Sequence, residues 1–181
     1  MRVDGFIGPS HVSALIGSRP YEPFAAQYRR PVVIAGFEPL DVMQAVLMLV
    51  EQLNEGRSCI ENQFTRGVTR DGNRRAQDLV AAILEPRPVF EWRGLGEVPW
   101  SGLRIRGEFA EFDAESRFTM PIVPVAENAA CLCPGVIRGV SKPTDCTLFG
   151  ARCTPRNPIG SCMVSSEGTC AAYYKYRRQA A

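Results

Sequence analysis

The sequence predicts an α/β protein in which a partial parallel-sheet domain is followed by an irregular, cysteine-rich domain. Three observations support this fold class. Short apolar runs alternate with helical patterns up to about residue 118. The run Pro31–Ala35 (PVVIA) is compact and β-branched, as is typical of a buried parallel strand. From Ala130 onward the periodicity ends, and glycine, proline and cysteine become frequent. We therefore expect domains at residues 1–118 and 119–181.

The first domain is expected to begin with a short strand at Val3–Ile7, followed by a loop of sequence GPSH. A short helix then covers Val12–Ile16, and Pro31–Ala35 forms the next strand. The segment Asp41–Asn54 is apolar on nearly every face, which predicts a helix packed deep in the domain.

The second half of this domain contains a helix over Asn73–Leu84, which follows the turn Asp71-Gly72 and stops before Pro86. We expect Phe90–Gly96 (FEWRGLG) to be a loop and Leu103–Phe109 to be a final strand. The last 51 residues have too little apolar patterning to build their own core. Such a segment needs covalent or metal staples to hold one structure.

Composition and charge argue against several classes of protein. A hydrophobic content of 45% is enough for a core, and a formal net charge of +2 without basic–aromatic runs does not favour a nucleic-acid binder. The amino-terminal residues lack the apolar run of a secretory signal, and the longest apolar run, Ala45–Val50, is too short to span a bilayer. We expect a cytoplasmic protein.

Six of the seven cysteines lie in the last 51 residues, at Cys131, Cys133, Cys146, Cys153, Cys162 and Cys170. In a reducing cytoplasm such a group more often binds metal or does redox chemistry than forms structural disulfides. A four-iron cluster can take its four thiolates from scattered turns, whereas structural zinc is usually indicated by paired C-x2-C motifs, which are absent here. The spacing of the cysteines therefore disfavours structural zinc without excluding it. The spacing also differs from the C-x2-C-x2-C motif of ferredoxins.

Two cysteines exceed the four that such a cluster needs, and the closeness of Cys131 and Cys133 argues against both binding the same cluster. One of the two could form a disulfide beside the metal, where electrons passing through the cluster would reduce it. The net charge of +5 from residue 131 onward, seven basic against two acidic residues, would stabilise a negative cluster, or it could be a solvated basic tail. Cys59 is expected to be an ordinary, semi-buried thiol.

Two loops follow predicted strands, at the sheet edge where α/β proteins bind ligands. One contains His11, the single histidine of the chain, and the other is Gly36–Asp41. Asp41 stands where a helix N-cap belongs, so capping alone would explain it, whereas Glu38 has no such structural explanation. Each is a candidate ligand-binding residue.

Together the motifs PSHVS, GFEPLD, FEWRGLG, SGLRIRGEFAEFDAE, DCTLFGARCTPRNPIGSCMVSSEGTC and AAYYKY resemble the family of the hydrogenase maturation factor HypD. The resemblance covers about the carboxy-terminal half of that family. It implies an incomplete, Rossmann-like second lobe followed by an iron–sulfur domain, and the amino-terminal lobe, with its Cys-Gly-x-His-x-His motif, is missing. The chain is thus expected to be a truncated or split family member, or a fragment.

The resemblance also implies a function. Family members are redox-active scaffolds, rather than ordinary enzymes, for assembly and transfer of the Fe(CN)2CO group of [NiFe]-hydrogenase, with a HypC-type chaperone and a HypE-type cyanide donor as partners. The family's [4Fe-4S] cluster carries over onto Cys131, Cys146, Cys153 and Cys170, and its redox disulfide onto Cys133 and Cys162. Residues His11, Glu38 and Asp41 match motifs that line the iron cleft. Binding of the Fe(CN)2CO iron is expected to need the missing lobe.

Two other hypotheses fit the cysteines. The chain could be a stand-alone iron–sulfur thiol/disulfide redox protein that reduces a partner's disulfide. It could also be a structural interaction module held together by its cysteines.

Overall fold

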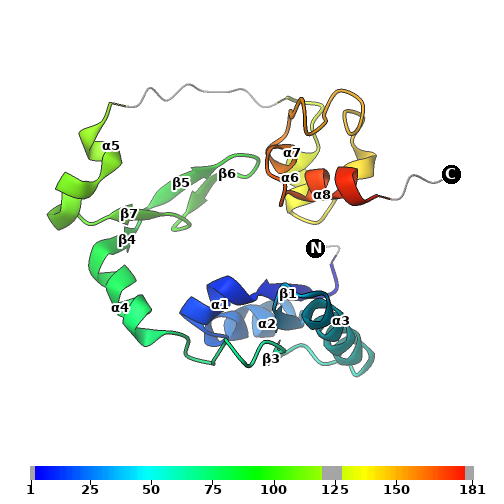
Figure 1. The fold of residues 1–181 in the computed structure, drawn as a ribbon, viewed down its shortest axis with the longest axis horizontal. Helices are drawn as coiled ribbons and strands as arrows, with labels where there is room; N and C mark the ends of the chain where they lie inside the picture. Colours follow the sequence, from blue (N-terminus) through cyan, green and yellow to red (C-terminus); the bar gives the residue numbers. More distant parts are fainter. Residues whose placement is uncertain (1–2, 120–127, 178–181) are drawn as a thin grey trace. The chain divides into compact units, whose positions relative to one another are not determined.

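The computed structural model describes residues 3–119 and 128–177. The chain divides into two compact units, Val3–Ile83 and a second unit that begins at Leu84 (Figure 1). A parallel sheet with helices and a separate cysteine-rich region confirm the predicted fold class. The backbone contacts place the boundary between the two units at Leu84. The domain boundary predicted after residue 118 rests on the change in amino-acid composition and stays a prediction.

The first unit is built on a parallel sheet with the strand order β1-β2-β3. The strands are β1 (Phe6–Pro9), β2 (Val32–Ala35) and β3 (Ile60–Asn62). Phe6 lies opposite Val32, and Val32 lies opposite Ile60. The helices of this unit are α1 (Ser10–Ile16), the 3-10 helix η1 (Arg19–Tyr21), α2 (Glu22–Tyr28), α3 (Pro39–Asn54) and α4 (Arg74–Ile83).

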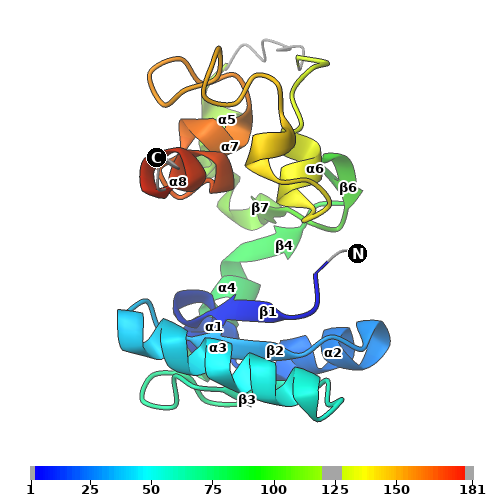
Figure 2. The same ribbon diagram turned by 90° about the vertical axis from the view of Figure 1, so that its right-hand side faces the viewer.

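The core of this unit lies between β2 and α3. Every residue of β2 is buried, with Val33 and Ile34 fully so, as the β-branched run predicted. Helix α3 runs alongside β2 and β1 (Figure 2) and places Ala45 against the sheet. The central strand therefore fixes the position of the loops that follow β1 and β2.

Several predictions for this unit need correction. The first strand begins at Phe6 instead of Val3 and includes Gly8 and Pro9, so α1 begins at Ser10. Helix α3 is confirmed, but the expectation that all its faces are buried is wrong, since Leu40 and Met43 are largely exposed. Helix α2 and strand β3 were not predicted. Both are short, and α2 carries a proline at its amino-terminal turn, which is compatible with a helix start.

The second unit begins with two small antiparallel pairs. Strand β4 (Leu84–Pro86) pairs with β7 (Leu103–Ile105), and β5 (Val89–Trp92) pairs with β6 (Gly96–Pro99) as a hairpin. The expected loop at Phe90–Gly96 is therefore wrong, because most of this segment belongs to the hairpin. The rings of Phe90 and Trp92 lie 5.0 Å apart, a contact that stabilises the short β5.

The expected final strand at Leu103–Phe109 ends at Ile105, and a 3-10 helix η2 (Gly107–Phe112) and helix α5 (Ala114–Arg117) follow it. The cysteine-rich region consists of turns and short helices, namely α6 (Cys133–Ile137), η3 (Pro143–Asp145), α7 (Ser161–Val164) and α8 (Thr169–Tyr176). Within the ranges 3–119 and 128–177, no helix has the length and apolar character needed to cross a membrane.

Candidate functional site

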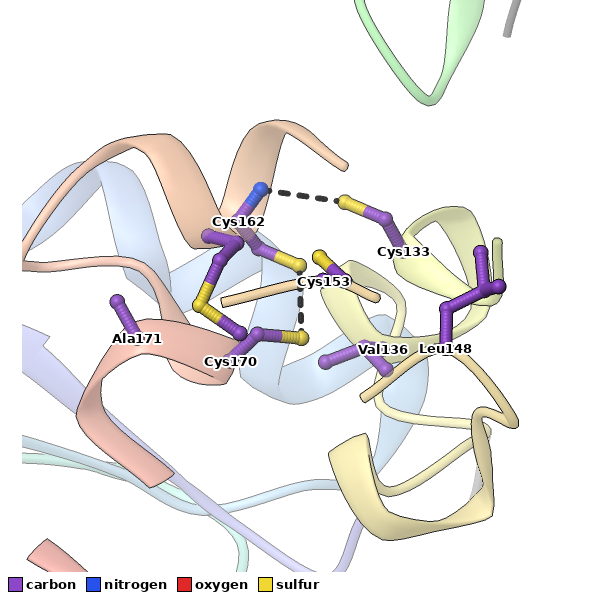
Figure 3. Close-up of a cluster of buried hydrophobic side chains, with 8 residues drawn as sticks. Cys133, Val136, Leu148, Cys153, Cys162, Cys170 and Ala171 are labelled. Atoms are coloured by element: carbon purple, nitrogen blue, oxygen red, sulfur yellow. Dashed lines mark hydrogen bonds between the residues drawn. The ribbon is translucent and has the colours of Figure 1, made fainter. Parts of the chain in front are cut away.

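The six carboxy-terminal cysteines line one cavity in the second unit. They are Cys131, Cys133, Cys146, Cys153, Cys162 and Cys170, and Met163, which is 1% exposed, closes one side. In Figure 3 the side chains of four of them surround a common space beneath α7. These four are buried, so the prediction that this region has no core of its own is wrong: it has a small core in which thiols replace aliphatic side chains. The structure therefore brings together cysteines that are up to 39 residues apart in sequence.

Helices α7 and α8 place two thiols in direct contact. The Sγ of Cys162 donates to the Sγ of Cys170 at 3.0 Å. The backbone N–H of Cys162 donates to the Sγ of Cys133 at 3.3 Å, and that sulfur lies 3.1 Å from the hydroxyl of Ser161. All seven cysteines are free thiols in this structure. Cys162 is thus adjacent both to its predicted disulfide partner and to a predicted cluster ligand.

Glycine is required where the backbone passes the thiols. A Cβ added at Gly160 would lie 2.6 Å from the Sγ of Cys131 and 3.0 Å from the Cβ of Cys133. One added at Gly168 would lie 2.2 Å from the carbonyl oxygen of Cys162. The irregular, glycine-rich sequence therefore has a specific effect, which is to let the chain fold closely around the sulfurs.

Burial determines the protonation of these thiols. It raises the pKa of Cys162, and contacts with Cys133 and Cys170 raise that pKa further. Burial also raises the pKa of Cys131 and of Cys170. These side chains are protonated thiols at neutral pH, so a metal that binds them as thiolates must displace their protons.

The β5–β6 hairpin reaches the same site. Its turn residue Arg93 donates to the carbonyl oxygen of Ile159 at 3.4 Å and lines a small cavity together with Cys131 and Cys133. The sequence drew attention to the FEWRGLG motif without connecting it to the cysteines. A cation beside a thiolate-rich centre stabilises its negative charge.

The donor set fits a thiolate-bound metal group. Six soft donors converge on one cavity, and each must lose only a proton to bind iron or zinc. The cavity has room for about one water molecule. Across the described parts of the chain, no three or more His, Cys, Asp or Glu side chains are arranged to hold a metal ion. The chemistry of the thiols thus fits a metal group, whereas their positions would have to change for three or more of them to bind it.

Cys59 belongs to the first unit and is not one of the cysteines that line the cavity. It follows α3 in the first unit and is exposed, so the expectation of a semi-buried thiol is wrong. Its backbone N–H donates to the Oε1 of the fully buried Gln52 at 3.0 Å. Because the donor is the backbone, this contact fixes the segment after α3 and assigns no role to the Cys59 thiol.

The two loops at the strand ends also come together, as the parallel order of β1 and β2 requires. The ring of His11, on α1, lies 5.3 Å from the ring of Phe37 in the loop after β2. The buried Ser13 donates to the carbonyl oxygen of Pro9 at 2.8 Å and lies 3.1 Å from the hydroxyl of Tyr21. His11 thus lies at the predicted sheet edge, and the Ser13 contacts fix the start of α1.

Asp41 is an ion-pair partner in this structure. It is 5% exposed, and its oxygens accept from Arg66 at 2.8 and 2.5 Å and from Gln63 at 2.9 Å. The N-cap position belongs to Glu38, so the predicted capping role of Asp41 is wrong. The exposed Glu38 reaches Arg66 at 3.4 Å. No local sequence pattern connects Arg66 or Gln63 with Asp41, because both lie more than twenty residues from it.

This ion pair predicts a loss of stability in acid. The hydrogen bonds from Arg66, and next those from Gln63, hold the pKa of Asp41 below its ordinary value of 3.8. The unfolded chain therefore takes up the proton first, so the stabilisation is complete above about pH 4 and is lost as the pH falls through the lower, folded pKa. Thermal unfolding between pH 5 and pH 2 checks this. Asp41→Asn should be less stable at neutral pH and less sensitive to acid, and an unchanged acid slope would contradict the assignment.

Known proteins resemble this chain over almost its whole length. A family model described as "HypD: Hydrogenase formation hypA family" matches residues 1–177. The chain is 65% identical over 176 residues to the hydrogenase maturation factor HypD of Cupriavidus necator, covering 97% of this chain and 46% of that relative. It is 62% identical over 179 residues to the hydrogenase expression/formation protein HupD of Azotobacter chroococcum, covering 99% and 47%. It is 50% identical over 180 residues to HypD of Rhodobacter capsulatus, covering 97% and 48%. The chain spans about half the length of these curated relatives.

Proposed function

The chain belongs to the HypD family, and from this premise we propose that it takes part in [NiFe]-hydrogenase maturation as an iron–sulfur scaffold. The observation that carries the proposal is the convergence of six cysteines on one cavity. Because the chain spans about half the length of its relatives, it would be a partial copy of the whole scaffold. A stand-alone thiol/disulfide redox protein is not favoured, since the relatives are named for hydrogenase maturation and expression.

The proposed ligands of a [4Fe-4S] cluster are Cys131, Cys146, Cys153 and Cys170. All four line the cavity, and Gly160 allows Cys131 to approach it. A bound cluster would supply one-electron transfer. The chain's own residues would exclude water, through Met163 and the buried thiols, and Arg93 would balance the negative charge.

Cys133 and Cys162 are proposed as the redox pair. The hydrogen bond from the Cys162 backbone to the Cys133 sulfur keeps the two residues adjacent. Reduction of a disulfide between them breaks one S–S bond and consumes two electrons and two protons. The contact between Cys162 and Cys170 would place this pair next to a cluster ligand, which shortens the electron path.

The iron that carries cyanide and carbon monoxide is the proposed cargo. Its cleft would be lined by His11, Glu38 and Asp41, of which His11 and Glu38 are exposed and Asp41 is held by Arg66. Asp41 would then act by fixing the loop instead of binding iron. We propose that a HypC-type chaperone and a HypE-type cyanide donor are the partners, that the compartment is the cytoplasm, and that the cargo binds only when the other half of the family's sequence is present.

Anaerobic reconstitution tests the central claim. The purified chain should turn brown and bind about four irons and four sulfides, in keeping with ligation by four thiolates. A colourless protein that binds one zinc would overturn the proposal.

In a hydrogenase-maturation mutant, the chain alone should fail to restore activity, and co-expression of the other half should restore it. Rescue by the chain alone would contradict the partial-copy assignment.

A further inference from the structure

Helix α3 turns a band of large apolar side chains toward solvent. The band consists of Leu40, Met43, Val46, Leu47 and Val50, which are 77%, 67%, 41%, 57% and 46% exposed. At 3.6 residues per turn, these positions fall within an arc of about 120° on the helix. Phe37, in the loop between β2 and α3, is 71% exposed. Soluble proteins rarely leave such a continuous apolar surface uncovered, and where they do it is usually a binding site.

The opposite face of α3 is already occupied within the first unit. Its buried residues are Asp41, Ala45 and Gln52. Asp41 binds Arg66, and Gln52 accepts from the backbone of Cys59. These polar contacts fix the rotation of the helix, so the apolar band cannot turn toward the sheet. The inner face also packs Ala45, Met48 and Leu49 against the sheet core. Helix α3 therefore already has one buried face, and the outward band is a second apolar surface that an ordinary surface helix would not carry.

The band also lacks charge. From Leu40 to Val50 the acidic residue is Asp41, which is buried on the other face, and Glu51 follows only at the edge. A surface for a charged or nucleic-acid partner would carry charged side chains. The composition fits an apolar protein surface instead.

The lengths of the relatives indicate which polypeptide covers the apolar band of α3. The matched region is less than half of each relative's length, so in those proteins it is joined to at least as much polypeptide again. A segment on the same chain meets the helix at a high effective concentration, which favours it over a second copy. We propose that the outward face of α3 binds the part of the HypD-family sequence that this chain lacks. This inference goes beyond the proposed iron chemistry, because the contact needs no metal.

Co-expression tests the interface. The probe is the part of the Cupriavidus necator HypD sequence that has no counterpart in this chain, produced together with the tagged chain. Affinity capture should recover the two in equal amounts. The double variant Met43→Glu with Leu47→Glu should reduce capture at least tenfold while leaving the melting temperature of the isolated chain unchanged, since both side chains are exposed. The matched control is Leu79→Glu, which alters an exposed leucine on α4 and should retain full capture.

Four outcomes would overturn the proposal: no capture by the unaltered chain, equal capture by the double variant, a lower melting temperature of the isolated double variant, or a dimer of the isolated chain that the double variant dissociates. The third would mean that the band is already covered within this chain, and the fourth that a second copy covers it. Iron content is measured in the same samples, so failure of the cluster proposal is seen separately.

Discussion

Replacement of Cys153 by serine should lower the iron bound after anaerobic reconstitution from about four atoms per chain to less than one. Cys153 is 6% exposed and faces the cavity, where the backbone N–H of Ile159 donates to its sulfur at 3.4 Å. A serine hydroxyl is a harder and much less acidic ligand, so it does not replace a thiolate on iron. The same loss is expected at Cys131, Cys146 and Cys170. Iron and sulfide analysis with visible absorption checks each variant.

The remaining cysteines provide the controls. Cys59→Ser should bind iron fully, because Cys59 is exposed and lies in the first unit. Cys133→Ser and Cys162→Ser should also bind iron, but they should lose the redox disulfide, which titration of free thiols measures. Because Cys162 and Cys170 are in contact, either of them is close enough to the cavity to be the ligand. If Cys162→Ser loses iron and Cys170→Ser retains it, the two residues have exchanged roles and the ligand assignment is wrong.

The elements that the sequence predicted well are those whose pattern is local. Val32–Ala35 was identified because four consecutive apolar, mostly β-branched residues suit a strand buried on both sides. Helix α3 was identified because Asp41–Asn54 is a long segment that is apolar on nearly every face. Its outward face was misjudged for a physical reason. Hydrophobic residues on all sides predict burial, but they do not say whether the covering surface belongs to the same chain.

The parts that the sequence did not predict depend on distant contacts. Arg66 and Gln63 donate the hydrogen bonds that hold the Asp41 carboxylate, yet no local sequence pattern connects these two residues to Asp41. Arg93 reaches the cysteine region only because β5 and β6 form a hairpin, and its hydrogen-bond partner Ile159 is 66 residues away. Tertiary contacts of this kind override the local preference for a loop.

The cysteine region illustrates a middle case. Its clustering predicted a site, and the structure shows the sulfurs around one cavity. The sequence predicted that these cysteines hold the region together by binding metal or forming disulfides, because it would have no core of its own. The structure instead has a small core in this region, and half of its buried residues are cysteines. Free cysteine packs as a small apolar residue, so these thiols contribute to folding before any metal binds. A cysteine variant must therefore be checked for folding by circular dichroism before its iron content is interpreted.

A substitution that leaves every thiol in place separates these two roles. Gly160→Ala adds a methyl group where a Cβ meets the sulfur of Cys131 at 2.6 Å and the Cβ of Cys133 at 3.0 Å. The Cys131 side chain can rotate away, but the Cβ of Cys133 is fixed by α6 and cannot, so we expect destabilisation of about 1–3 kcal/mol, typical of overpacking.

The larger effect of Gly160→Ala should fall on iron, because rotation of Cys131 removes one proposed ligand from the cavity. Iron bound after reconstitution should fall below half of that in the unaltered chain, while far-UV circular dichroism is retained. Gly107→Ala is the matched control, since a Cβ at Gly107 has no neighbour within 4 Å, and it should change neither stability by more than about 0.5 kcal/mol nor iron content. Full iron binding by Gly160→Ala would show that Cys131 need not occupy its present position. The contact with Gly160 would then no longer support the assignment of Cys131 as a ligand.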